Sequence, residues 1–134
     1  MTSPVQEMTK VLRKNNIQYD FTERHFPRSK KYPFGHSQDL FNIIDIIALD
    51  DGILGIQVCG GEGDYMKHVR KIIEEYKSNT INWIVNGGRL ELWAWRRVKV
   101  KRGGKRMVWR PRIADILLAG SELYVEERNS SLLI

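Results

Sequence analysis

Residues 42–59 read NIIDIIALDDGILGIQVC, and the rest of the chain is organised around them. Leu40–Leu49 is the most apolar part of the sequence, and Ile53–Val58 is a second, shorter apolar run. Asp50-Asp51-Gly52 separates the two runs and has the composition of a tight turn. This pattern predicts a buried β-hairpin.

Asp45 stands in the middle of the first predicted strand, among branched apolar side chains. Because burying an unpaired carboxylate is costly, a folded chain tolerates it only beside a partner or a cation. Pairing with a buried arginine, or protonation, is the structural alternative. Across the turn, the Gln57 side chain and the Val58 carbonyl offer oxygens that suit Mg²⁺ or Mn²⁺ together with a carboxylate. We therefore predict that Asp45 and Gln57 lie side by side and share one cation.

The other elements follow from capping and periodicity. Ser3-Pro4 followed by Gln6 predicts a capped helix that ends at Asn15-Asn16. The elements predicted after it are a strand at Tyr19–His25, a loop at Phe26–Gln38, a helix over residues 65–77 capped by Asp64, a helix or strand at Thr80–Asn86, and strands at Arg89–Arg97 and Met107–Ile113. This order predicts a single-domain α/β sandwich around a central mixed sheet, with a core at residues 5–116 and an unplaced tail at 117–134.

The hairpin resembles motifs II and III of the PD-(D/E)XK nucleases, especially archaeal Holliday-junction resolvases and their small phage-encoded relatives. In those proteins an Asp in a strand reading x-D-h-h-A, where h is apolar, is followed after a hairpin by h-h-E-V-K. Asp45 matches the Asp, whereas Gln57 stands at the position of the Glu and Cys59 at that of the Lys. The resemblance extends over residues 5–95. It implies a restriction-endonuclease-like fold and hydrolysis of DNA with Mg²⁺ or Mn²⁺.

The resemblance also implies further site residues. Some relatives take the lysine from the following helix, which here offers Lys67 and Lys71. The remaining acid would be Glu23 or Glu7, and Glu23 is preferred because a strand beside the hairpin would point it at the same site. Asp39-Leu40-Phe41, ahead of the hairpin, resembles a feature of the phage-type members.

Positive charge is concentrated in one segment. Residues 96–112 contain nine Arg or Lys residues and no acid, although the net charge of the whole chain is only +6. Such a block predicts a docking surface for nucleic acid, and a solubilising hairpin is the alternative. The residues predicted to bind DNA are Arg96, Arg97, Lys99, Lys101, Arg102, Lys105, Arg106 and Arg110.

Composition excludes several other classes. The chain has one cysteine, Cys59, and three scattered histidines, which predict neither a disulfide framework nor a zinc site. No apolar run reaches the roughly 18 residues that span a bilayer. We expect an intracellular, cytoplasmic protein, in the host cytoplasm if it is phage-encoded.

Two functions fit these patterns. The first is a divalent-metal-dependent endonuclease that acts on duplex, branched or junction DNA. The second is a nuclease-fold protein that binds nucleic acid without cutting it, because Gln57 and Cys59 replace two residues of the motif. Enzymes that cut both strands of a duplex are commonly two-fold dimers, so a homodimer is a further expectation.

Overall fold

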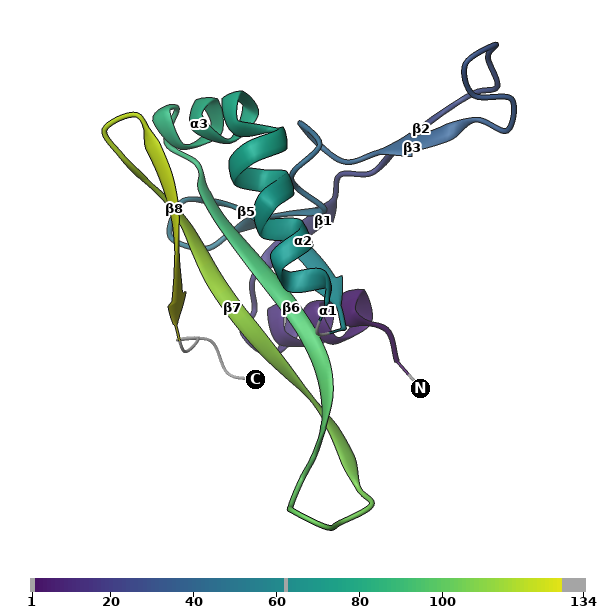
Figure 1. Ribbon diagram of the computed structural model, residues 1–134, viewed down its shortest axis with the longest axis vertical. Helices are drawn as coiled ribbons and strands as arrows, with labels where there is room; N and C mark the ends of the chain where they lie inside the picture. The colour runs from purple at the N-terminus through teal and green to yellow at the C-terminus, as the bar shows by residue number, and fades with distance from the viewer. Residues whose placement is uncertain (1, 62, 129–134) are drawn as a thin grey trace.

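A computed structural model describes residues 2–61 and 63–128 (Figure 1). Its elements are α1 (Pro4–Lys14), β1 (Gln18–Phe21), β2 (Arg24–Phe26), β3 (His36–Gln38), β4 (Ile46–Leu49), β5 (Ile53–Gly60), α2 (Asp64–Arg70), the π-helical turn η1 (Lys71–Glu75), α3 (Lys77–Val85), β6 (Arg89–Lys99), β7 (Met107–Ala119) and β8 (Glu122–Arg128). Six strands form the central sheet in the order β1-β4-β5-β6-β7-β8. Only β5 and β6 pair in parallel within that sheet. The fold is therefore α/β with a central mixed sheet, as predicted.

The predicted hairpin is confirmed as β4 and β5. Its two strands pair from Ile46 opposite Ile56 to Leu49 opposite Ile53. Asp51 and Gly52 take φ values of 50° and 119°, the left-handed conformations that a two-residue hairpin turn requires.

The start of the first strand differs from the prediction. The expected strand Leu40–Leu49 is extended only from Ile46, so Asp45 directly precedes β4 and does not lie within it. The chain before it closes into a turn, in which the Ile44 N–H donates to the Leu40 carbonyl at 3.1 Å. Asp45 therefore stands where the strand begins, at the edge of the core.

Helices cover both faces of the sheet. The capping box predicted for α1 is present, because Ser3 and Gln6 each accept a hydrogen bond from the backbone N–H of the other. Side chains of β6 alternate between the two faces: Trp93 belongs to the buried cluster under α1, and Leu92 to the cluster under α2. The sheet is thus a middle layer, as a sandwich requires.

Two hairpins project from this body in Figure 1, one formed by β2 and β3 and one by the far ends of β6 and β7. We call residues 24–38 the β2–β3 arm and residues 96–112 the β6–β7 arm. The β2–β3 arm corrects two predictions, since Tyr19–His25 is split between two sheets and Phe26–Gln38 is not an unpaired loop. The split occurs at Thr22, whose backbone N–H donates to the Asp45 carbonyl at 3.0 Å. Beyond that bond the chain leaves the central sheet.

The second half of the chain brings further corrections. The cap residue of α2 is Gly63, and Asp64 is the first residue of that helix. Thr80–Asn86, which fitted a helix or a strand, lies almost entirely in α3. The unplaced tail continues β7 and forms β8, up to Arg128, and residues 129–134 are outside the described part. No helix among the described residues is long and apolar enough to span a bilayer.

Candidate functional site

Asp45 and Gln57 lie side by side at the end of the β4–β5 hairpin. The Asp45 backbone N–H donates to the Ile56 carbonyl at 2.9 Å, which holds the residue against β5. Its side-chain Oδ2 accepts a hydrogen bond from Gln57 Nε2 at 2.5 Å and another from the Val58 backbone N–H at 2.8 Å. The Asp45 carboxylate therefore forms hydrogen bonds with the part of β5 that extends beyond the first residue of β4.

The predicted Val58 carbonyl faces the same place. The N–H and C=O of one strand residue point toward the same neighbouring strand. Because the Val58 N–H bonds Asp45, the Val58 carbonyl is also directed at the end of β4. This orientation is compatible with the ligand role predicted for it.

Gln57 contains an unusual buried oxygen. The residue is only 2% exposed, and its Oε1 atom has no hydrogen-bond partner among the described residues. Leaving a buried carbonyl oxygen unsatisfied costs roughly 1–3 kcal/mol. A donor or a cation at this position would remove that cost.

The sequence patterns did not identify Asp39 as a site residue. Its carboxyl group lies close enough to that of Asp45 to disfavour the ionised form of Asp45. Burial, followed by this contact with Asp39, raises the pKa of Asp45 to about 7. The Val58 N–H and the charge of Lys71 act in the opposite direction. The site thus contains a second acid that disfavours the ionised form of Asp45.

Lys71 is the cation of this site. Its Nζ lies 3.9 Å from Asp39 Oδ2 and favours the ionised form of Asp45. Lys71 is also the first residue of η1, in which the Tyr76 N–H donates to the Lys71 carbonyl at 2.8 Å. Single π-turns inside helices are frequent at functional sites, because they change the direction in which side chains point.

The other predicted residues lie elsewhere. Lys67 is exposed on α2, and no ion pair with it is seen in the described ranges. Glu23 is exposed in the link between β1 and β2, and Glu7 pairs with Lys10 on α1 at 2.9 Å. Cys59 is buried, and burial, with the nearby Asp64 and Asp45, raises the pKa of its thiol to about 12. That thiol stays protonated at neutral pH and serves as an apolar packing group.

The eight residues predicted to bind DNA are all exposed on or beside the β6–β7 arm. Arg112, the ninth cation of the block, pairs with Glu127 at 2.5 Å and lies over the Tyr65 ring. Arg96 and Arg110 are direct cross-strand partners. This register places two guanidinium groups side by side on one face of the arm.

Strand register relates this arm to the site. Gln57 pairs with Leu92 on β6, and every second residue of a strand lies on the same face. Arg96 is therefore on the face of Gln57, four residues or about 13 Å further along β6. Helix α2 covers this face between the two positions, because Leu92 and Ala94 are buried beneath it.

A second basic surface, which the sequence analysis did not recognise, is the β2–β3 arm. It contains Arg24, Arg28, Lys30 and Lys31 and no acid, and its Phe34 is 94% exposed. Thirteen of the 22 Arg and Lys residues lie in the two arms, so the remainder has nine cations against 16 acids, a net charge of −7. Counting charge over the whole segment between Glu23 and Asp39 would have revealed it.

Comparisons with known proteins bring no relative. No family model matches the sequence, and neither a curated protein nor a solved structure matches it.

Proposed function

We propose that this chain is a divalent-metal-dependent endonuclease that hydrolyses DNA phosphodiester bonds. The observation that carries the proposal is the pair of acids Asp39 and Asp45, in which the pKa of Asp45 is raised to about 7 so that Asp45 keeps a proton below that pH, beside the unpartnered buried oxygen of Gln57. A divalent cation would replace that proton and would give the Gln57 Oε1 atom a partner. Hard oxygen donors of this kind are the ligands that Mg²⁺ and Mn²⁺ prefer.

The residues that would hold the ion are Asp45, Asp39, Gln57 and the Val58 carbonyl. When bound, the ion would supply a more acidic water and would neutralise charge on the scissile phosphate. Lys71, beside Asp39, would hold a phosphate oxygen or the attacking water, which is the task of the motif lysine that Cys59 replaces. Lys67 lies one helical turn away and is exposed, so it is the weaker candidate for this role. Glu23 is also exposed, and we propose for it only a contact outside the set of metal ligands.

The two arms would bind the DNA backbone. Their thirteen cations project from a body of net charge −7, so electrostatic attraction would direct a polyanion to the arms. Duplex, branched or junction DNA fits a protein with two projecting basic hairpins. A restriction-endonuclease-like fold, a cytoplasmic location and a homodimer are parts of the same proposal.

One observation favours binding without cleavage as the second candidate. The Gln57 amide contributes no negative charge, and the pKa of Asp45 lies near 7, so the site has fewer charges than a typical two-carboxylate metal centre. If this candidate is correct, the protein binds DNA with the salt dependence of a multi-phosphate contact and never cuts it.

The separating experiment incubates supercoiled plasmid with the protein and Mn²⁺ or Mg²⁺, beside an EDTA control and an Asp45→Asn variant. Nicked or linear product that needs both the metal and Asp45 supports the endonuclease. Intact plasmid at every metal concentration, with binding retained, supports the second candidate.

A second experiment measures binding at a series of salt concentrations. The logarithm of the affinity should fall with the logarithm of the salt concentration at a slope of about −0.9 per phosphate contact. Changing Lys101, Arg102, Lys105 and Arg106 to Ser should reduce that slope.

A further inference from the structure

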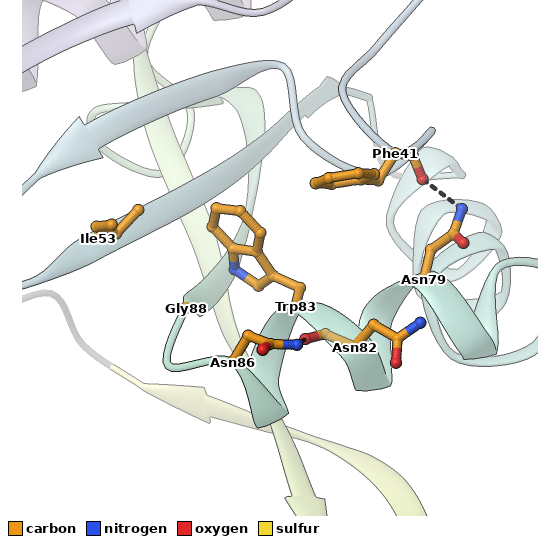
Figure 2. A pocket seen from close by; sticks show the side chains of 7 residues that line it. All are labelled: Phe41, Ile53, Asn79, Asn82, Trp83, Asn86 and Gly88. Atoms are coloured by element: carbon orange, nitrogen blue, oxygen red, sulfur yellow. Dashed lines mark hydrogen bonds between the residues drawn. The ribbon is translucent and has the colours of Figure 1, made fainter.

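A cavity of about 420 Å³ lies beside α3, and its lining contains no charged residue. This volume is within the range of small-molecule sites. Figure 2 shows the Trp83 ring projecting from α3 between Ile53 and Phe41. The lining side chains are Phe41, Ile53, Asn79, Asn82, Trp83 and Asn86. Two aromatic rings with amides at the rim would suit a neutral, planar group with polar edges.

Phe41 is held in this cavity by a strained turn. Its φ is 53° and that of Asn42 is 63°, in the left-handed region that a bulky residue such as Phe rarely adopts. The Asn79 Nδ2–H donates to the Phe41 carbonyl at 2.8 Å, the bond drawn in Figure 2. Phe41 is nevertheless 50% exposed. Strain that the surroundings maintain around an exposed side chain is typical of ligand sites.

Trp83 is fixed just as firmly. Its indole Nε1–H donates to the Arg89 carbonyl at 2.7 Å. A side chain at Gly88 would come within 2.4 Å of the indole, so the glycine makes room for it. The rings of Phe41 and Trp83 are 6.3 Å apart and inclined by 54°, so the two rings do not close the space by stacking on each other.

The same turn joins the cavity to the candidate metal centre. Phe41 follows Asp39 by two residues, which span at most about 7 Å. This maximum backbone span between Asp39 and Phe41 equals about two nucleotide steps of 3.4 Å along one DNA strand.

We propose that this cavity binds one unpaired nucleobase of the DNA, stacked on Phe41, with an edge against the inclined Trp83 ring and with asparagine amides contacting its other edges. Amide side chains pair well with base edges, and aromatic side chains stack on any base. Because the lining is uncharged, the phosphates would be bound by the metal centre and the arms and not by the cavity. The inference rests on the proposed function and narrows its substrate to DNA with an unpaired base, such as a bulge, flap or branch.

The test measures affinity in EDTA, so that cleavage has no part in it. Wild-type protein should bind a duplex with a one-nucleotide bulge about 10-fold more tightly than the fully paired duplex. Replacing the bulged nucleotide by an abasic one should remove that preference. Phe41→Ala should also remove it while affinity for the paired duplex is unchanged, and Phe41→Tyr should keep it. Phe21→Ala is the matched control, since Phe21 is 54% exposed on β1 and does not line the cavity.

The outcomes separate this inference from the nuclease proposal. Equal binding of bulged and paired duplexes, or a preference that survives the abasic replacement, overturns the base-binding cavity and leaves the nuclease intact. A preference that Phe41→Ala retains overturns it as well. Failure to bind any of the three DNAs overturns both proposals together.

Discussion

Two buried or partly buried carboxyl groups, Glu91 and Asp45, are held in opposite electrostatic surroundings. Glu91 has a side chain only 5% exposed, forms an ion pair with Arg128 and accepts a hydrogen bond from Trp93 Nε1 at 2.8 Å. Asp45 instead lies against a second acid, Asp39, and its closest donors are the uncharged Gln57 amide and the Val58 N–H.

The difference shows what distinguishes a structural acid from a candidate functional one. A buried carboxylate that faces a guanidinium is already compensated and has little need of another ion. A carboxyl group whose pKa is raised by burial and by a second acid, beside an amide oxygen without a partner, is compensated only partly. Chains accept such local cost mainly where a ligand or a reaction needs it.

The largest expected effect is a difference in cleavage rate between variants of Asp45 and of Glu91. Asp45→Asn should lower the rate of plasmid cleavage by about 10³-fold or more, because it removes the central metal ligand. Glu91→Gln should change the rate by less than about threefold, since Glu91 precedes Leu92, the register partner of Gln57, and so lies on the opposite face of the sheet. Initial rates of nicking with Mn²⁺ measure both. Equal losses in the two variants would show that the comparison is wrong.

The second effect is a difference in the free energy of unfolding when the surroundings of Glu91 or Asp45 itself are changed. Arg128→Ala should lower the free energy of unfolding by about 3 kcal/mol, because it leaves the buried Glu91 with only the 3.9 Å contact to Arg89 and also removes the pair with Asp115. Asp45→Asn should not lower it at pH 8 without metal, since at that pH, above the pKa of about 7, the neutral amide replaces a buried ionised carboxylate that faces Asp39. Urea titrations give both values. Lys77→Ala, which breaks only the exposed pair with Glu122, is the control and should cost less than about 1 kcal/mol.

The third prediction concerns Lys71, the cation beside Asp39 and Asp45. Lys71→Met should slow cleavage by about 10²-fold, the scale of losing one electrostatic stabiliser. Lys67→Met, the matched change one helical turn away on an exposed residue, should have little effect. Single-turnover rates at saturating DNA distinguish this loss from weaker binding. Similar rates in wild type and Lys71→Met would place the needed charge on another residue.

The smallest effect is a difference in pH dependence. The folded pKa of Asp45 is about 7 against an ordinary 3.8, so the folded state retains a proton that the unfolded state loses. This group therefore makes metal-free protein less stable as the pH rises from about 4 to about 7. The melting temperature of wild type should fall over that window relative to Asp45→Asn, and 10 mM Mg²⁺ should raise it by a few degrees above pH 7. Glu91→Gln should keep the wild-type slope.

The sequence predicted the parts of the fold that depend on local signals. The capping box at Ser3 and the turn at Asp51-Gly52 each specify geometry within a few residues, and both are present. The burial of Asp45 in an apolar run was enough to predict its position beside Gln57.

The missed features depend on contacts between distant segments. Asp39 lies in a turn without periodicity, and only the folding of that turn onto the hairpin brings its carboxyl to Asp45. The π-turn at Lys71 changes the phase of a helix whose apolar spacing looked regular. The β2–β3 arm pairs three residues on each side across a segment with two prolines, too short a match for a strand pattern.

The separation of charge between the arms and the body has a kinetic consequence. Thirteen cations lie in two hairpins that project toward different ends of the molecule, and the rest of the chain has a net charge of −7. Near a polyanion such a molecule experiences a torque, so it rotates during diffusion until one of the arms leads and the acidic body turns away. Encounters in the wrong orientation become rarer, and association is faster than the size of the arms alone would allow. Added salt screens this orienting field beyond about one Debye length, which is about 8 Å at physiological ionic strength. It therefore slows the first encounter more than it alters the final contacts.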